Sequence, residues 1–96
     1  MNIGFRPNPK AQVEMKFREL FGGDRRVTVS GVRVTPEDCR RRGLRCTTRD
    51  GLYVTEILVD GRPIARSTDR DWRRAYRLLA GEVERLYADG SLLGDA

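Results

Sequence analysis

The sequence predicts a small single domain of the α+β class, in which a long C-terminal helix packs on an antiparallel sheet of three to four strands, with an N-terminal helix and one short helix. Three observations carry this prediction. The chain has 96 residues, enough for one modest core. Two apolar runs flank Asp60-Gly61, a typical sequence for a two-residue hairpin turn. Apolar side chains then recur at helical spacing from residue 72 to residue 87. We expect a flexible arm at 1–8, the folded domain at 9–90 and a flexible tail at 91–96.

A helix of about thirteen residues is predicted near the N-terminus. Asn8 is a favourable N-cap, Pro9 suits the first helical position, and Gly22-Gly23 ends the pattern. Apolar residues lie between them at helical spacing, namely Val13, Phe17, Leu20 and Phe21. Residues 13–18 also alternate between apolar and charged side chains, as an edge strand does, so a strand is the alternative.

Residues 25–34 predict β-structure. Val27 and Val29 alternate with polar residues, and Val32 and Val34 do so again after a change of phase at Ser30-Gly31. We expect either one strand with a bulge or two short strands joined by a tight turn.

A short helix is predicted directly after this segment. Thr35 caps it, Pro36 opens it and Gly43 ends it. Acidic residues at 37 and 38 precede three arginines at 40–42, an order that complements the helix dipole. This order gives the arginine run a structural explanation that competes with a binding role.

Three strand-like runs follow at 44–51, 52–59 and 62–68. The run 52–59 is apolar on both faces apart from Thr55 and Glu56, which is typical of a central strand. Pro63 has no N–H to donate, so we expect its strand at an edge of the sheet, or the proline at the start of that strand.

The last helix is the clearest element. Thr68 or Asp69 is expected to cap it, and its apolar stripe should pack on the sheet. The stripe consists of Trp72, Ala75, Tyr76, Leu79, Val83, Leu86 and Tyr87. For its aromatic residues, core packing is favoured over stacking with a ligand. Gly81 interrupts the helix and is expected to allow close backbone contact with a strand.

The composition favours an anionic partner. The chain has 19 basic side chains, 17 of them arginine, against 14 acidic ones, for a net charge of +5. The excess belongs to residues 1–49, which hold twelve basic and five acidic side chains, whereas residues 50–96 hold seven and nine. The competing explanation is that a GC-rich genome encodes arginine frequently.

Several function classes are disfavoured. No apolar run is long enough to span a bilayer and no signal region is present, so we expect a cytoplasmic protein without membrane contact. The chain has no histidine, no glycine-rich phosphate loop and no carboxylate pair at motif spacing, which argues against catalysis, a cofactor or a metal site. Cys39 and Cys46 match no metal or redox spacing, so two free, partly buried thiols in a reducing compartment are expected.

The candidate binding residues are arginines of the basic first half, of the strands and of the start of the last helix. They are Arg25, Arg26, Arg40, Arg41, Arg42, Arg45, Arg49, Arg62, Arg66, Arg70, Arg73, Arg74 and Arg77. Arg33 belongs to the same basic field. The four at 70–77 are expected on the outer face of the helix as like-charge i,i+4 pairs, at the helix end where positive charge is disfavoured. An anion would relieve this repulsion; the alternative is that solvent, Asp69 and Asp71 compensate it.

The block 43–89, with its Asp-Gly hairpin, a short polar step and then a helix carrying aromatic and leucine positions, resembles the three-strand-plus-helix DNA-binding domain of phage-type integrases. In that family the sheet enters the major groove. The resemblance implies that strand residues face a groove, namely Arg45, Thr47, Arg49, Thr55, Arg62 and Arg66.

A second resemblance is to double-stranded-RNA-binding domains, which run helix, three strands, helix. It rests on Asn8-Pro9-Lys10 at the start of a helix, on "ILVDGRPIARST" before the last helix, and on Arg73-Arg74-Ala75, which approximates the Lys-Lys-x-Ala helix start of that family. The small, arginine-rich chain is also similar to accessory proteins of phages and mobile elements, including anti-CRISPR inhibitors.

The predicted function is non-catalytic binding of nucleic acid through arginine-rich surfaces, with DNA favoured over RNA. The alternative is a small phage-type inhibitor that binds an acidic surface of a host protein or nucleoprotein complex. A third possibility is a structural subunit that buries apolar residues against a copy of itself, so both a monomer and a homodimer are expected states.

Overall fold

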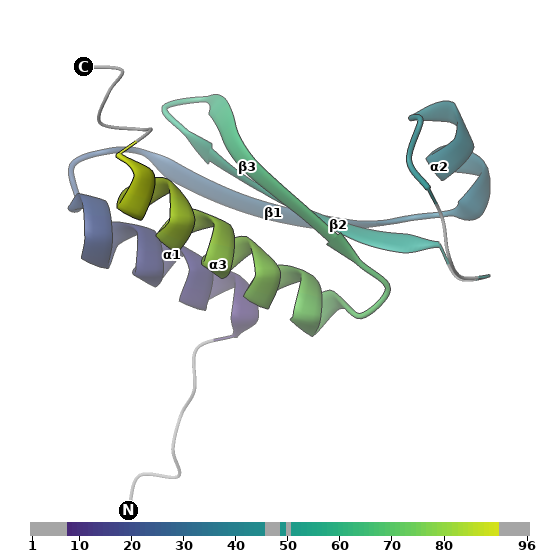
Figure 1. Ribbon diagram of the computed structural model, residues 1–96, viewed down its shortest axis with the longest axis horizontal. Helices are drawn as coiled ribbons and strands as arrows, with labels where there is room; N and C mark the ends of the chain where they lie inside the picture. The colour runs from purple at the N-terminus through teal and green to yellow at the C-terminus, as the bar shows by residue number, and fades with distance from the viewer. Residues whose placement is uncertain (1–7, 46–48, 50, 91–96) are drawn as a thin grey trace, which may run out of the picture.

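The computed structural model describes residues 8–45, 49 and 51–90. In chain order these residues form α1 (Pro9–Phe21), β1 (Val27–Val34), α2 (Pro36–Arg41), β2 (Leu52–Val59), β3 (Arg62–Asp69) and α3 (Trp72–Asp89). The predicted α+β class is confirmed, because one antiparallel sheet carries α1 and α3 on the same face (Figure 1). Apart from Asn8, the predicted arm and tail lie outside the described residues.

The sheet has the strand order β1-β2-β3, so the predicted central position of 52–59 is confirmed. β3 is an edge strand, as Pro63 predicted. The β2–β3 turn has positive φ at both central residues, 53° at Asp60 and 83° at Gly61, which is the backbone shape of a type I′ hairpin. The pairing shifts by one residue next to Leu58, which leaves Ile64 as an extra residue in β3.

α1 and α3 lie side by side and run in the same direction (Figure 1). At their far ends the Phe21 and Tyr87 rings meet edge to face at 5.3 Å. The α1 helix begins as predicted, because Asn8 Oδ1 accepts a hydrogen bond from the Ala11 N–H at 2.7 Å. The strand alternative is wrong, since Val13 and Phe17 are buried at helical spacing.

The main core lies between these two helices and the sheet. Its buried members are Val13, Phe17, Val27, Val29, Ile57, Val59, Tyr76, Leu79 and Val83. A second, smaller core lies on the opposite face of the sheet, beneath α2. It contains Val34, Cys39, Leu52 and Val54.

These two cores explain the change of phase in β1. The strand is continuous and pairs with β2 without a shift, from Val27 opposite Val59 to Val34 opposite Leu52, so the expected bulge or tight turn is wrong. Val27 and Val29 belong to the main core, whereas Val34 belongs to the second one. The apolar positions change phase because β1 contributes apolar side chains to one face of the sheet near its start and to the other face at its end.

The short helix α2 begins as predicted, with the Thr35 side chain accepting from the Asp38 N–H at 3.1 Å. After it the chain turns back at Gly43, where φ is 72°, and the Leu44 N–H donates to the Cys39 carbonyl at 2.8 Å. Cys39 is disulfide-bonded, so the prediction of a free thiol at this position is wrong. The cysteines therefore give no argument for a reducing compartment. Cys46 lies outside the described residues.

Four further expectations need correction. A strand was expected at 44–51, but the described residues of this segment, 44, 45, 49 and 51, belong to no strand. The other residues of the segment lie outside the described residues. Asp71 caps α3, two residues after Asp69 and three after Thr68, the two expected caps. Gly81 faces open space rather than a strand. Trp72 and Tyr87 are exposed, at 39% and 46%, rather than packed in the core.

No helix in the described ranges is long and apolar enough to cross a membrane.

Candidate anion-binding groove at the helix starts

The structure separates the thirteen candidate arginines into several places. At one end of the sheet, before β1 and after the hairpin turn, lie Arg25, Arg26 and Arg62. On α2 and in the segment after it lie Arg40, Arg41, Arg42, Arg45 and Arg49. Arg66 projects from β3 opposite Glu56. At the start of α3 lie Arg70, Arg73, Arg74 and Arg77.

Three of these arginines are neutralised by a nearby carboxylate. Arg41 pairs with Asp38, Arg66 with Glu56 at 3.4 Å, and Arg74 with Asp69 at 3.8 Å. At the start of α3, by contrast, the other three form no ion pair with any carboxylate in the described part of the chain. These are Arg70, Arg73 and Arg77.

The four arginines at 70–77 are exposed, as expected, but only three of them lie within α3. Arg70 precedes the helix, whose N-cap is Asp71. Asp71 Oδ1 accepts from the Arg73 N–H at 3.2 Å, and Asp69 Oδ2 accepts from the Asp71 N–H at 2.9 Å. The two acidic residues thus act as a capping pair. Arg73 and Arg77 remain as an i,i+4 pair, and both line an open groove between α1 and α3.

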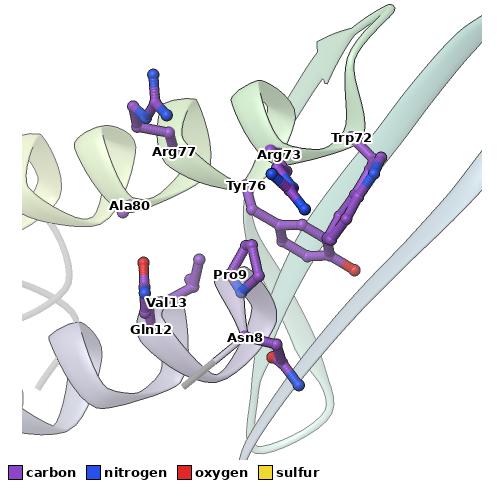
Figure 2. A pocket seen from close by; sticks show the side chains of 9 residues that line it. All are labelled: Asn8, Pro9, Gln12, Val13, Trp72, Arg73, Tyr76, Arg77 and Ala80. Atoms are coloured by element: carbon purple, nitrogen blue, oxygen red, sulfur yellow. The ribbon is translucent and has the colours of Figure 1, made fainter. Parts of the chain in front are cut away.

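An open groove of about 550 Å³ runs between the first halves of α1 and α3. Figure 2 shows its walls, with α1 on one side and α3 on the other. It is lined by Asn8, Pro9, Gln12, Val13, Trp72, Arg73, Tyr76, Arg77 and Ala80. Because α1 and α3 run in the same direction, both helices present their N-terminal ends here, where the helix dipole is positive.

Trp72 and Arg73 contact each other at the end of this groove. The guanidinium carbon of Arg73 lies 5.2 Å from the centre of the indole ring, in cation–π geometry. Tyr76 meets the same indole edge-on, with ring centres 6.3 Å apart at 87°. The indole is held by these two neighbours and still exposes 39% of Trp72 to solvent. Arg77 lies about 6 Å further along the helix, since four residues advance it by 1.5 Å each.

Behind the groove, the hydroxyl groups of Tyr53 and Tyr76 lie 3.4 Å apart. Burial is the main cause that raises the pKa of Tyr76 above its ordinary value, followed by the hydrogen bond with Tyr53. The phenol therefore stays protonated at neutral pH and serves as packing and hydrogen-bonding group rather than as a base.

Arg33 adds a further positive charge at this end of the molecule. Its Nη2 donates to the Arg70 carbonyl at 3.0 Å, and its guanidinium carbon lies 5.7 Å from the centre of the Tyr53 ring. Arg33 thereby ties β1 to the loop that leads into α3. Its place in the basic field was visible in the sequence, but its proximity to Arg70 was not, because 37 residues separate the two.

Among the strand residues implied by the integrase resemblance, Thr55 is fully buried and cannot contact a ligand. Its hydroxyl lies 3.2 Å from the carbonyls of both Ser67 and Ala75, which joins β2 to β3 and to α3. Arg62 and Arg66 are exposed on β3, Arg45 and Arg49 are exposed outside strands, and Thr47 lies outside the described residues. The strand residues therefore do not form one basic surface.

The groove combines two cations with an exposed aromatic surface, which suits an anion that carries a flat, unsaturated group. Among the described residues that line it, none is a carboxylate, a cysteine or a histidine. Comparisons of the chain with protein-family models, with curated proteins and with solved structures found no match.

Proposed function

We propose that this protein is a non-catalytic nucleic-acid-binding module whose main phosphate contacts are Arg70, Arg73 and Arg77. The observation that carries the proposal is that these three arginines are exposed around the start of α3, beside the start of α1, and form no ion pair with a carboxylate of the described residues. Phosphate is the natural partner of such groups, since a guanidinium donates two parallel hydrogen bonds to its oxygens.

The local electrostatics support an anionic ligand. Cations at a helix N-terminus are disfavoured by the helix dipole, and like charges at i,i+4 repel, each by a few tenths of a kcal/mol to about 1 kcal/mol. Asp71 and Asp69 offset part of this cost, and Asp69 also pairs with Arg74. A bound phosphate removes the remaining repulsion, so the same groups that weaken the free protein strengthen the complex.

A second set of contacts is available from the arginines of α2 at the same end of the sheet. In the sheet register, Tyr53 of β2 lies opposite Arg33 of β1 and opposite Asp69 of β3. The next residue of β1, Val34, lies opposite Leu52, and the chain then enters α2. Arg25, Arg26 and Arg62 lie at the other end of eight-residue strands, roughly 25 Å away. The interface proposed here therefore centres on the end that carries α2 and the start of α3, with Arg40 and Arg42 as secondary contacts.

The sheet face opposite α1 and α3 is a weaker candidate for phosphate contacts. A groove of about 260 Å³ there carries Arg42 and Arg66, but the Glu56 carboxylate lies 3.4 Å from Arg66. Apart from the inserted α2, the order α1, three strands, α3 fits the layout of double-stranded-RNA-binding domains. The block 43–89 that resembles integrase domains contains only two strands and α3 among its described residues, because β1 precedes α2. A layout carries no function by itself, so the proposal rests on the arginines.

The test is binding of labelled duplex DNA, single-stranded DNA and duplex RNA, followed by fluorescence anisotropy at several salt concentrations. We expect affinity to fall steeply as salt rises, because phosphate contacts release counterions. The double variant Arg73→Gln/Arg77→Gln should weaken binding and reduce the salt slope by about one to two units, since each lost phosphate contact removes roughly 0.7 to 0.9.

Arg85→Gln is the matched control. Arg85 lies on the same helix, but its guanidinium is held by Glu82 at 2.8 Å and by Asp89 at 3.0 Å. Its loss should leave the salt slope unchanged. Absence of binding to all three nucleic acids, or binding that does not respond to salt, contradicts the proposal.

A second candidate function is favoured by one specific feature, the exposed Trp72 beside Arg73. Tryptophan and arginine are the residue types most enriched in the hot spots of protein interfaces. Under this alternative the protein is an inhibitor that binds an acidic protein surface, and it forms a stoichiometric protein complex while binding free nucleic acid poorly.

A further inference from the structure

We infer that the groove between α1 and α3 holds one unstacked nucleotide, with its base against the Trp72–Arg73 pair and its phosphate at Arg77. The protein then prefers single-stranded nucleic acid, or an extruded base, over an intact duplex. This inference rests on the proposed nucleic-acid function and adds to it the form of the ligand.

The size and composition of the groove fit a nucleotide. Its volume of about 550 Å³ lies within the range of roughly 300 to 1,000 Å³ typical of small-ligand sites. A phosphate alone needs only the cations, whereas this groove also presents an exposed indole and the partly exposed apolar side chains of Pro9 and Ala80 (Figure 2). The apolar walls would remain hydrated unless the ligand carries a flat apolar part.

The Trp72–Arg73 pair is suited to stacking because it is already ordered. Tyr76 is only 4% exposed and supports the indole edge-on, while Arg73 lies over the ring. Bases stack on both indole rings and guanidinium planes, and every base has a flat face, so such a platform tolerates any sequence. Little side-chain freedom is lost on binding, since the two side chains are paired in the free protein.

The wall on α1 supplies polar groups for the edge of a base. Asn8 uses its side-chain oxygen to cap α1, and its side-chain NH₂ group is a further donor that binds no group among the described residues. A base within a duplex cannot reach this wall, because its edge is paired and its faces are covered by neighbours. The arrangement therefore selects nucleotides that are free of pairing.

Trp72 is the only tryptophan of the chain, so intrinsic fluorescence reports directly on this groove. The experiment titrates the protein with an unlabelled single-stranded oligonucleotide, with the same oligonucleotide carrying abasic sites, with its duplex and with a mononucleotide. We expect saturable quenching by the single strand, weak quenching by the mononucleotide, and little change with the abasic strand or the duplex. An unchanged emission spectrum under conditions where anisotropy shows the single strand bound overturns the inference.

Variants give a second, independent readout. Trp72→Ala should weaken single-strand binding roughly five- to 150-fold, which is the range for loss of one stacked base, and should change abasic-strand binding less than twofold. Trp72→Phe retains an aromatic face and should fall between. Leu78→Ala is the control, because Leu78 is an exposed apolar residue on the same helix that does not line the groove. Equal affinity of Trp72→Ala and the parent protein for the single strand overturns the inference.

The failure of this inference is distinguishable from failure of the proposed function. If Arg73→Gln/Arg77→Gln weakens binding to duplex and single strand alike, and Trp72→Ala weakens neither, the phosphate contacts stand and the nucleotide site is wrong. If no nucleic acid binds at any salt concentration, both proposals are wrong, and a stoichiometric protein complex through Trp72 becomes the function to test.

Discussion

At Gly31 the side chains of Tyr53 and Tyr76 lie close against the backbone of β1. A methyl group at this position would meet the Tyr76 hydroxyl and would lie 2.7 Å from two atoms of the Tyr53 ring and hydroxyl. The glycine is required here for space and not for an unusual backbone angle, since φ at Gly31 is not positive. This single residue lets two tyrosines from β2 and α3 pack across β1, directly behind the groove.

Replacing Gly31 with alanine should therefore destabilise the fold by about 1 to 3 kcal/mol, the usual cost of overpacking a core. Urea denaturation followed by circular dichroism measures this change. The double variant Gly31→Ala/Tyr76→Phe should recover part of the loss, because it removes the hydroxyl that the new methyl group meets. A double variant less stable than the sum of the two single changes would contradict the steric explanation.

Tyr76 makes the stability of the fold depend on alkaline pH. Its folded pKa is raised, mainly by burial, above the unfolded value of about 10. Below pH 10 both states keep the proton and the stabilising contribution is fully present. Above it the unfolded chain loses the proton first, so the free energy of unfolding falls by up to about 1.4 kcal/mol per pH unit. Urea midpoints at pH 9 and pH 11 should drop more for the parent protein than for Tyr76→Phe, and parallel losses would argue against this.

At the scale of the elements, the start of α3 combines a cap with a binding surface. Asp71 caps the helix through its side-chain oxygen, while its negative charge lies beside the arginines proposed to hold phosphate. Stability and affinity therefore make opposite demands on this residue.

Asp71→Asn separates these two roles. Asparagine caps a helix about as well as aspartate, so the fold should lose only the dipole interaction, about 0.3 to 1 kcal/mol. Nucleic-acid affinity should rise by roughly twofold to tenfold at low salt and return toward the parent value at high salt, where screening is strong. Anisotropy titrations measure this change. Asp71→Ala, which also removes the cap, is the comparison, with a loss of stability of about 1 kcal/mol.

The elements themselves were largely predictable, because their signals are local. Asn8 and Pro9 identify the start of α1, Thr35 and Pro36 the start of α2, and Asp60-Gly61 the hairpin turn. Each depends on neighbours within four residues along the chain.

The misread positions depend on distant partners. Val32 and Val34 changed phase because the second core lies on the other face of the sheet, and Thr55 was placed at a surface because nothing nearby in sequence shows that α3 covers it. The sequence did not predict the candidate groove either, because its walls come from segments that are distant in the chain. The helical spacing predicts a core position for Trp72, whereas its ring contacts Tyr76 and Arg73 at the first residue of α3 and stays 39% exposed.

At the scale of the whole molecule, the parallel course of α1 and α3 has the largest consequence. It brings two positive helix ends together (Figure 1). Residues 8–13 and residues 72–80 thereby line one groove. Arg33 contacts the Arg70 carbonyl at this end of the sheet, whereas the arginines near the hairpin turn lie at the other end.

By itself, the sequence determined the fold class, the order and approximate bounds of the helices and strands, and the excess of arginine, because caps, turns and periodicity act over a few neighbouring residues. Only the tertiary structure decided which arginines gather, which aromatic ring remains exposed and which face of β1 is covered at each end. Those outcomes depend on how remote surfaces pack against one another, and the packing of α1 beside α3 is written in no single stretch of the chain.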